Sequence, residues 1–239
     1  MDPYKTNELP DLLRSNAYPG RGIVVGCTED GRRALCAYFI MGRSPNSRNR
    51  ILAEEGGALF TRPFDPEQVK DPGLIIYPAL RRYQNRIILT NGDQTDTILE
   101  GLSSGKGFAE SLLSRTFEPD GPNWTPRISA LLTLDPCHYF YEMSLLKSAD
   151  AQGSACRRCC FVYPALPGIG HFLHTYEGDG TPLPSFCGEP RQVCIPADVE
   201  DFANEVWDSL DHDNRISLYV LAVDLQSGEE EKYLINKKH

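Results

Sequence analysis

The segment Gly42-Arg-Ser-Pro-Asn-Ser-Arg-Asn-Arg50 contains three arginines and no acidic residue. The whole chain has 33 acidic and 24 basic residues and a net charge of −9, so this segment reverses the prevailing charge. A guanidinium group can hold two phosphate oxygens at once, and the neighbouring Ser and Asn side chains add further donors. The segment therefore suits a phosphomonoester. The alternative is a solvated basic loop that pairs with surface carboxylates.

A second polar segment, Leu89-Thr-Asn-Gly-Asp-Gln-Thr-Asp-Thr-Ile98, follows an expected strand and opens an expected helix. The free backbone N–H groups at a helix N-terminus attract anions, and short polar side chains gather at the same place. A plain turn followed by an N-cap at Asp93 or Thr95 explains the pattern about equally well. Both interpretations stay open.

A third segment, Asn123-Trp-Thr-Pro-Arg-Ile128, places Thr125 and Arg127 at the entry of an expected strand. Loops that enter strands are common positions for ligand-binding groups. The alternative is an exposed turn in which Trp124 covers the core.

Three further side chains could carry proton chemistry. Tyr77 ends an expected strand, Arg81 follows it four residues later, and Glu177 lies in Thr175-Tyr-Glu177. A neighbouring cation helps a phenol to donate a proton, and an arginine stabilises a developing oxyanion. The alternative for Tyr77 is a half-buried core residue.

Composition excludes several classes of function. The negative charge and the pI near 5.1 disfavour binding to nucleic acid or to an anionic membrane. No apolar run approaches the roughly 18 residues of a membrane span, and no export signal is present, so we expect a cytoplasmic protein with reduced cysteines. Phosphate-binding, dinucleotide-binding, zinc-protease and serine-hydrolase motifs are missing.

The 8 cysteines raise the question of a metal site. Cys156 and Cys159 have the spacing of a zinc pair, whereas Cys187 and Cys194 are too far apart for a zinc knuckle. We therefore expect no metal, and a four-thiolate zinc site is the alternative.

The elements that must position these residues are mostly strands. Two apolar runs, 22–27 and 34–41, flank a turn rich in Asp and Gly and predict a hairpin. Apolar periodicity predicts helices over 95–102, 108–117 and 199–210. The other expected strands span 58–61, 74–77, 86–90, 128–134, 159–163, 171–176, 216–223 and 232–235. The pattern favours a single α+β domain over 1–239, with mainly antiparallel sheets.

Five short motifs in this order resemble one known family, the archaeal-type IMP cyclohydrolases. The matching residues are Tyr18-Pro-Gly-Arg21, Arg43-Ser-Pro-Asn-Ser-Arg-Asn-Arg50, Tyr77 with Arg81, Asn91-Gly-Asp-Gln-Thr-Asp-Thr97 and Thr125-Pro-Arg127. The likeness covers roughly residues 18–135, which leaves 1–17 as an N-terminal extension and 137–195 as a divergent, cysteine-rich region. That region is expected to form a lid or a subunit contact, or to accompany a changed substrate.

The resemblance implies a four-layer αββα sandwich similar to that of the N-terminal-nucleophile hydrolases. Because the chain begins Met1-Asp2, it lacks the N-terminal nucleophile of that class. The implied reaction is the cofactor-free closure of 5-formamidoimidazole-4-carboxamide ribotide to inosine 5'-monophosphate in purine biosynthesis. The implied partner is this small-molecule purine ribotide, and a homo-oligomer is left open.

The resemblance also implies roles for individual residues. Tyr77 with Arg81 would act on the formyl oxygen, and Glu177 would be the base near the carboxamide. The implied phosphate and ribose ligands are Arg21, Arg43, Asn46, Arg48, Asn91, Gly92, Asp93, Thr95, Asp96, Thr97, Thr125 and Arg127. The alternatives are a non-catalytic purine-ribotide-binding protein and a related amidohydrolase with a different substrate.

Overall fold

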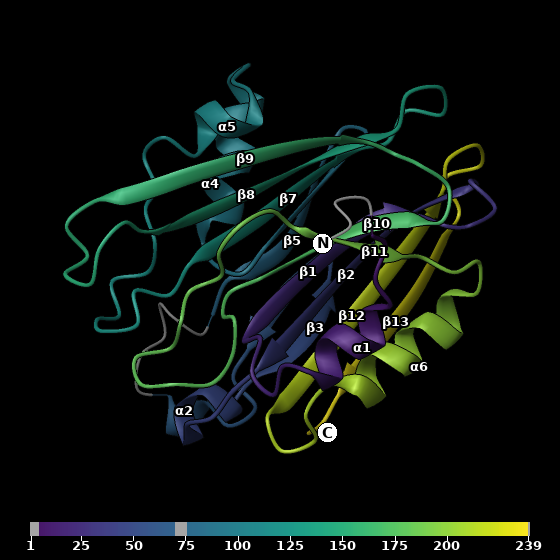
Figure 1. The fold of residues 1–239 in the computed structure, drawn as a ribbon. Coiled ribbons are helices and arrows are strands. Elements are labelled where there is room, and N and C mark those ends of the chain that lie inside the picture. Colours follow the sequence, from purple (N-terminus) through teal and green to yellow (C-terminus); the bar gives the residue numbers. More distant parts are fainter. Residues whose placement is uncertain (1–4, 70–75, 239) are drawn as a thin grey trace.

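Two mainly antiparallel sheets face each other, as a computed structural model of the chain shows (Figure 1). The structure describes residues 5–69 and 76–238. The protein is therefore of the α+β class, as the sequence predicts. No helix within the described ranges is long and apolar enough to cross a bilayer.

The first sheet has six strands, and each neighbouring pair is antiparallel. Its order is β11 (Arg191–Cys194), β10 (Ile169–His174), β1 (Arg21–Cys27), β2 (Arg33–Met41), β12 (Arg215–Asp224) and β13 (Glu230–Asn236). The central strands β1, β2 and β12 are buried on both faces, which explains why they read as unbroken apolar runs.

The second sheet has seven strands, again paired antiparallel in sequence order. The strands are β3 (Ile51–Glu55), β4 (Ala58–Arg62), β5 (Pro78–Tyr83), β6 (Arg86–Thr90), β7 (Arg127–Thr133), β8 (Phe140–Ser148) and β9 (Cys156–Pro164). Side chains such as Tyr38, Leu89 and Tyr141 fill the space between the two sheets.

Helices pack on the outer faces of the sheets (Figure 1). Helices α1 (Leu9–Arg14) and α6 (Val199–Ser209) cover the first sheet, and α4 (Gln94–Ser103) and α5 (Phe108–Ser111) cover the second. The chain also forms α2 (Pro45–Arg48) and the 3-10 turn η1 (Pro66–Gln68). On each outer face, the apolar side chains of one helix pair pack against those of one sheet and form a separate apolar cluster.

The hairpin of β1 and β2 and the helices α4 and α6 confirm the predictions for those stretches. The helix predicted over 108–117 is wrong in extent, because α5 has only 4 residues. Beyond Ser111 the chain makes i to i−3 turns, such as the bond from Leu112 N to Ala109 O, and these end the helix. Of the strand expected over 74–77, residues 74 and 75 lie outside the described residues, and β5 begins only at Pro78.

Two histidines of β10 give the fold a pH dependence. Burial lowers the pKa of both His171 and His174 from 6.5 to about 4. The folded state therefore holds neutral imidazoles, whereas the unfolded chain takes up protons once the pH falls below 6.5. We expect the free energy of unfolding to decrease from pH 6.5 to about 4, by at most about 1.4 kcal/mol per pH unit for each histidine.

Urea unfolding at several pH values tests this expectation. His174→Gln should flatten the pH dependence, because the glutamine side chain has no proton to gain over this range. Equal slopes for the two proteins would contradict the assignment.

Candidate active site

A polar cavity of about 300 Å³ opens between the start of β1, the β2–α2 loop and the loop of residues 118–125. The segment that follows β10 forms another wall. The lining includes Arg21, Arg43, Arg50, Glu118 and Tyr176. The cavity thus joins Arg21, the arginine-rich segment and the segment that contains Thr125, which are far apart in the sequence.

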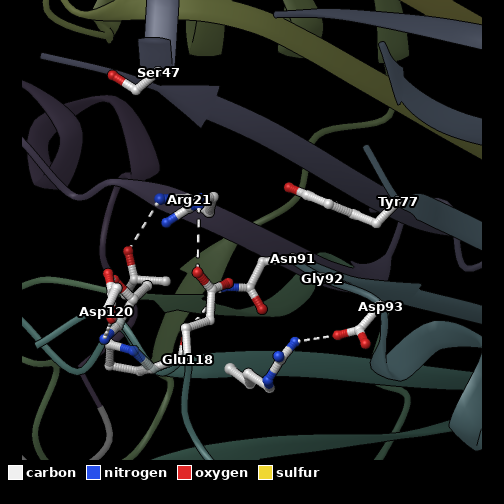
Figure 2. A network of polar contacts seen from close by, with 12 residues as sticks. Arg21, Ser47, Tyr77, Asn91, Gly92, Asp93, Glu118 and Asp120 are labelled. Atoms are coloured by element: carbon white, nitrogen blue, oxygen red, sulfur yellow. Dashed lines mark hydrogen bonds and ion pairs between the residues drawn. The ribbon is translucent and has the colours of Figure 1, made fainter. Parts of the chain in front are cut away.

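Arg21 enters the cavity because the chain turns sharply just before β1. Gly20 has φ +78, and a Cβ atom there would lie 2.2 Å from Thr175 Oγ1. The Arg21 amide donates to the same hydroxyl at 3.1 Å. This turn sends the guanidinium toward Glu118, with 4.0 Å between Arg21 Nη2 and Glu118 Oε2 (Figure 2).

Glu118 is a buried carboxylate, only 3% exposed, in the wall of the cavity. Its loop is pinned by the bond from Glu118 N to Thr125 O at 2.9 Å and by the bond from Thr125 N to Asp120 Oδ1 at 2.7 Å. Burial raises the pKa of Glu118, and the cations of Arg21 and Arg127 oppose that rise. A carboxylate in such surroundings can exchange protons with a bound ligand.

Arg50 brings a second buried guanidinium to the cavity, with 2% of the residue exposed. Its Nε donates to Ser47 O at 2.8 Å and its Nη2 donates to Met41 O at 3.3 Å. Burial lowers the pKa of Arg50, and the neighbouring charge of Arg21 lowers it further. The lining thus holds three guanidinium groups, of Arg21, Arg43 and Arg50, against two carboxylates, of Glu118 and Asp120, and the excess positive charge suits an anion.

Of the other residues of the arginine-rich segment, some line the cavity and others hold the segment in place. Arg43 lines the cavity, lies 4.9 Å from the ring centre of Tyr18 and pairs with Asp179. Asn46 lines the cavity as well. Arg48 instead donates to Gly42 O at 3.0 Å and to Asn214 Oδ1 at 3.2 Å, so it braces the segment.

Tyr77 is buried in the core between the sheets, and its hydroxyl lies 2.8 Å from that of Tyr38. Figure 2 shows the Tyr77 hydroxyl pointing toward Arg21. The structure does not bring Arg81 to Tyr77. Arg81 pairs with Asp96 of α4 at 3.1 Å, on the outer face of the second sheet. The cations near Tyr77 are those of Arg21 and Arg50.

Glu177 lies away from the cavity. The residue is exposed, and its Oε1 accepts a hydrogen bond from Cys187 N at 2.8 Å. Thr125 does line the cavity, where its Oγ1 lies 2.5 Å from the Tyr176 hydroxyl. The buried carboxylate of this site is Glu118.

The turn of residues 91–97 does not line the cavity. Asn91 and Gln94 are bonded to the start of β7, and Thr95 Oγ1 donates to Pro78 O at 2.5 Å. Asp93 pairs with Arg127, and Thr97 lies half-buried on α4. These contacts fit the interpretation of residues 91–97 as a turn that begins helix α4, rather than as an anion-binding segment.

The cysteines do not assemble into a metal site in the described part of the chain, where no group of three or more His, Cys, Asp or Glu side chains could hold an ion. Cys156 and Cys159 both lie on strand β9. Residues three apart on a strand point to opposite faces, so these two thiols cannot share one ion.

Sequence reasoning missed the roles of Glu118 and Arg50. Arg50 is the last arginine of the arginine-rich segment. The spacing of the three arginines does not indicate that Arg50 is buried while Arg43 and Arg48 are not. Glu118 lies in Glu118-Pro-Asp-Gly-Pro-Asn123, a composition that indicates only a turn.

Comparison with known proteins supports a common ancestry for this site. Residues 18–228 match the family model described as IMP cyclohydrolase-like protein. The match covers most of the chain, including every wall of the cavity. The chain belongs to the IMP cyclohydrolase-like family.

Curated relatives point the same way. An IMP cyclohydrolase of Methanopyrus kandleri is 39% identical over 118 residues, which is 48% of this chain and 58% of that protein. One from Methanothrix thermoacetophila is 33% identical over 120 residues, with the same shares. One from Methanococcus aeolicus is 27% identical over 164 residues, or 67% of this chain and 74% of that protein. The chain thus spans less than two thirds of the length of the first two relatives.

Proposed function

We propose that this protein is an IMP cyclohydrolase, which closes 5-formamidoimidazole-4-carboxamide ribotide to inosine 5'-monophosphate. The observation that carries the proposal is one cavity in which Arg21 lies 4.0 Å from the buried carboxylate of Glu118, with the buried Arg50 in the same lining. Membership of the family and the names of the relatives support the same reaction.

The positive side of the cavity binds the phosphate in this proposal. Arg50 and Arg43 supply charge, and Ser44, Asn46 and Ser47 line the same wall. The capping box between Ser44 and Ser47 holds α2 rigid, so these donors are set before the ligand arrives. A phosphate monoester is the ligand that such a set of donors fits.

Ring closure needs two ends of one molecule to meet and a few protons to move. The carboxamide nitrogen attacks the formyl carbon and a C–N bond forms. The formyl oxygen takes up two protons, one from each nitrogen, and leaves as water. The protein must therefore hold the ligand in a reactive conformation, stabilise negative charge on that oxygen and carry protons.

Arg21, Glu118 and Tyr77 suit these tasks. The Arg21 guanidinium is placed to face the formyl oxygen, and Glu118 accepts the proton from the carboxamide nitrogen. The Tyr77 hydroxyl lies 2.8 Å from that of Tyr38 and points toward Arg21 from outside the cavity lining, and in this proposal it supplies a proton to the departing oxygen (Figure 2). Glu118 takes the part of the base because it is buried at the cavity, whereas Glu177 is exposed elsewhere.

Incubation of the purified protein with the formamido ribotide, followed by absorbance, tests the reaction. Appearance of inosine 5'-monophosphate at a rate proportional to protein concentration is the expected result. Tight binding without turnover would favour a purine-ribotide-binding protein instead. Turnover of a different amide in its place would favour a related amidohydrolase.

Tyr77→Phe is expected to lower kcat about 100-fold, because the phenol proton is lost while the ring still fills its place. Steady-state kinetics of the ribotide reaction measure the effect. Tyr163→Phe, which changes a phenol on the edge strand β9, is the matched control. Equal kinetics for the wild type and Tyr77→Phe would remove Tyr77 from the mechanism.

The proposal extends to the finer description of the fold. The helix pairs on both outer faces support a four-layer αββα sandwich similar to that of the N-terminal-nucleophile hydrolases. A single domain over 1–239, a cytoplasmic location and assembly into a homo-oligomer complete the proposal.

A further inference from the structure

The turn of residues 91–94 lies outside the cavity, yet buried polar contacts fasten it to the start of β7. Asn91 Oδ1 accepts from Ile128 N at 2.9 Å, and Asn91 Nδ2 donates to Pro126 O at 2.9 Å. Gln94 Nε2 donates to Asn91 Oδ1 at 3.0 Å. The turn and the strand that carries Arg127 therefore form one rigid unit.

This unit grips the Arg127 guanidinium. Its Nη1 donates to Asp93 Oδ1 at 2.6 Å and to Gln94 Oε1 at 2.8 Å. At Gly92 a Cβ atom would lie 2.5 Å from Arg127 Nη1 and 2.5 Å from Gln94 Oε1. Gly92 has no positive φ, so its backbone would accept alanine. The space taken by the guanidinium group is what requires glycine here.

Arg127 is connected to the cavity through the loop of Glu118, because Glu118 N donates to Thr125 O at 2.9 Å, two residues before Arg127. The cavity lining does not include Arg127, but after Arg21 its cation is the next to lower the pKa of Glu118 against the effect of burial. Three cations surround Glu118: Arg21 of β1, Arg50 before β3 and Arg127 of β7. The other titratable groups near it are Asp120 of its own loop and the Tyr176 phenol. Figure 2 draws Asn91, Gly92 and Asp93 together with Glu118 and Arg21.

We propose that residues 91–94 are a clamp that fixes the Arg127 guanidinium, and that Arg127 is a positioning residue whose cation stabilises the Glu118 carboxylate for ring closure. The inference rests on the proposed function. It gives the Asn-Gly-Asp-Gln turn a task other than contact with the ribotide. It also explains why an arginine outside the cavity is held by two polar partners, Asp93 and Gln94, against a glycine that leaves room for it.

The pH profile of kcat/KM for the ribotide reaction tests the clamp. Arg127→Met should move the acid limb to higher pH by about one unit, because an opposite charge near Glu118 is removed. Gly92→Ala should move the limb in the same direction, since the new methyl group displaces the guanidinium. Arg127→Lys should return the limb toward the wild-type position, because it restores a cation.

Gly107→Ala is the matched control, because Gly107 has no atom within 4 Å of an added Cβ and its φ is −75. It should leave the profile where it is. An unmoved acid limb in Gly92→Ala and Arg127→Met, even with lower thermal stability, would overturn the proposal and leave the turn a structural role only.

A titration without substrate separates this inference from the proposed function. The infrared band of the protonated Glu118 carboxyl group, assigned by its loss in Glu118→Gln, can be followed against pH in the free protein. The band should persist to higher pH in Gly92→Ala and Arg127→Met than in the wild type. An identical titration in all three proteins would overturn the clamp, whereas absence of turnover by the wild type would refute only the proposed reaction.

Discussion

Glu118→Gln is expected to lower kcat for ring closure by about two to four powers of ten, while KM for the ribotide changes little. The substitution keeps the shape of the side chain but removes the proton acceptor closest to Arg21. The substitution also removes the buried negative charge opposite Arg21. The buried cation is then unpaired, so we expect a lower melting temperature together with the loss of activity. Steady-state kinetics and thermal unfolding of the same preparation measure both effects.

Glu177→Gln distinguishes the two candidate bases. The Glu177 carboxylate accepts a hydrogen bond from Cys187 N on an exposed loop, so its loss should affect kcat far less than the loss of Glu118. The reverse ranking would restore Glu177 as the base expected from the family resemblance. A binding measurement with inosine 5'-monophosphate shows whether either variant still forms the complex.

Arg50→Met is expected to raise KM for the ribotide roughly 10- to 100-fold, with a smaller change in kcat. Hydrogen bonds to a charged group contribute about 1.5–3 kcal/mol, and such bonds from the Arg50 guanidinium to the phosphate would be lost. Free inorganic phosphate should also inhibit the variant less than the wild type. Inhibition constants for phosphate measure this contribution separately from the chemistry of the ring.

Arg62→Met provides the matched control for Arg50→Met. Arg62 lies at the end of β4 and pairs with Glu55 at 2.9 Å, outside the lining of the cavity. The same substitution there removes a charge without removing a phosphate ligand. A similar rise in KM for both variants would show that the net charge of the surface, and not Arg50, governs binding.

The strands that are buried on both faces could be predicted from the sequence, because their apolar runs are continuous. The hairpin of β1 and β2 and the buried strand β12 are examples. The strands β3, β8 and β11 were missed. β8 carries Glu142 and Lys147 among its apolar residues, and β3 ends in two glutamates, so neither reads as a simple pattern.

The sequence predicted the arginine-rich wall of the cavity and singled out Tyr77, but it did not predict the buried carboxylate of Glu118. Arg43 and Asn46 line the cavity, as expected of the arginine-rich segment. Its other arginines separate because α2 is a single short helical turn, which directs Arg48 to Asn214 and Arg50 into the interior. The different directions of these arginines depend on the single turn of α2, and the spacing of the arginines in the sequence does not reveal them.

Tyr77 and Arg81 illustrate a different limit. A spacing of four residues would bring two side chains together on a helix, but β5 extends from Pro78. Arg81 is paired with Ile88 in the outer layer, whereas Tyr77 enters the core between the sheets. The cation that Tyr77 faces comes from β1, and only the packing of the two sheets reveals it.

In the proposed reaction, the cavity lined by Arg21, Arg50 and Glu118 expels the formyl oxygen of the ribotide as water. The most direct test of this reaction uses a ribotide labelled with heavy oxygen at the formyl group and follows both the nucleotide and the water by mass spectrometry. We predict that the wild type forms unlabelled inosine 5'-monophosphate and releases labelled water, and that Glu118→Gln slows both together. Binding of the labelled ribotide without release of labelled water would contradict the account.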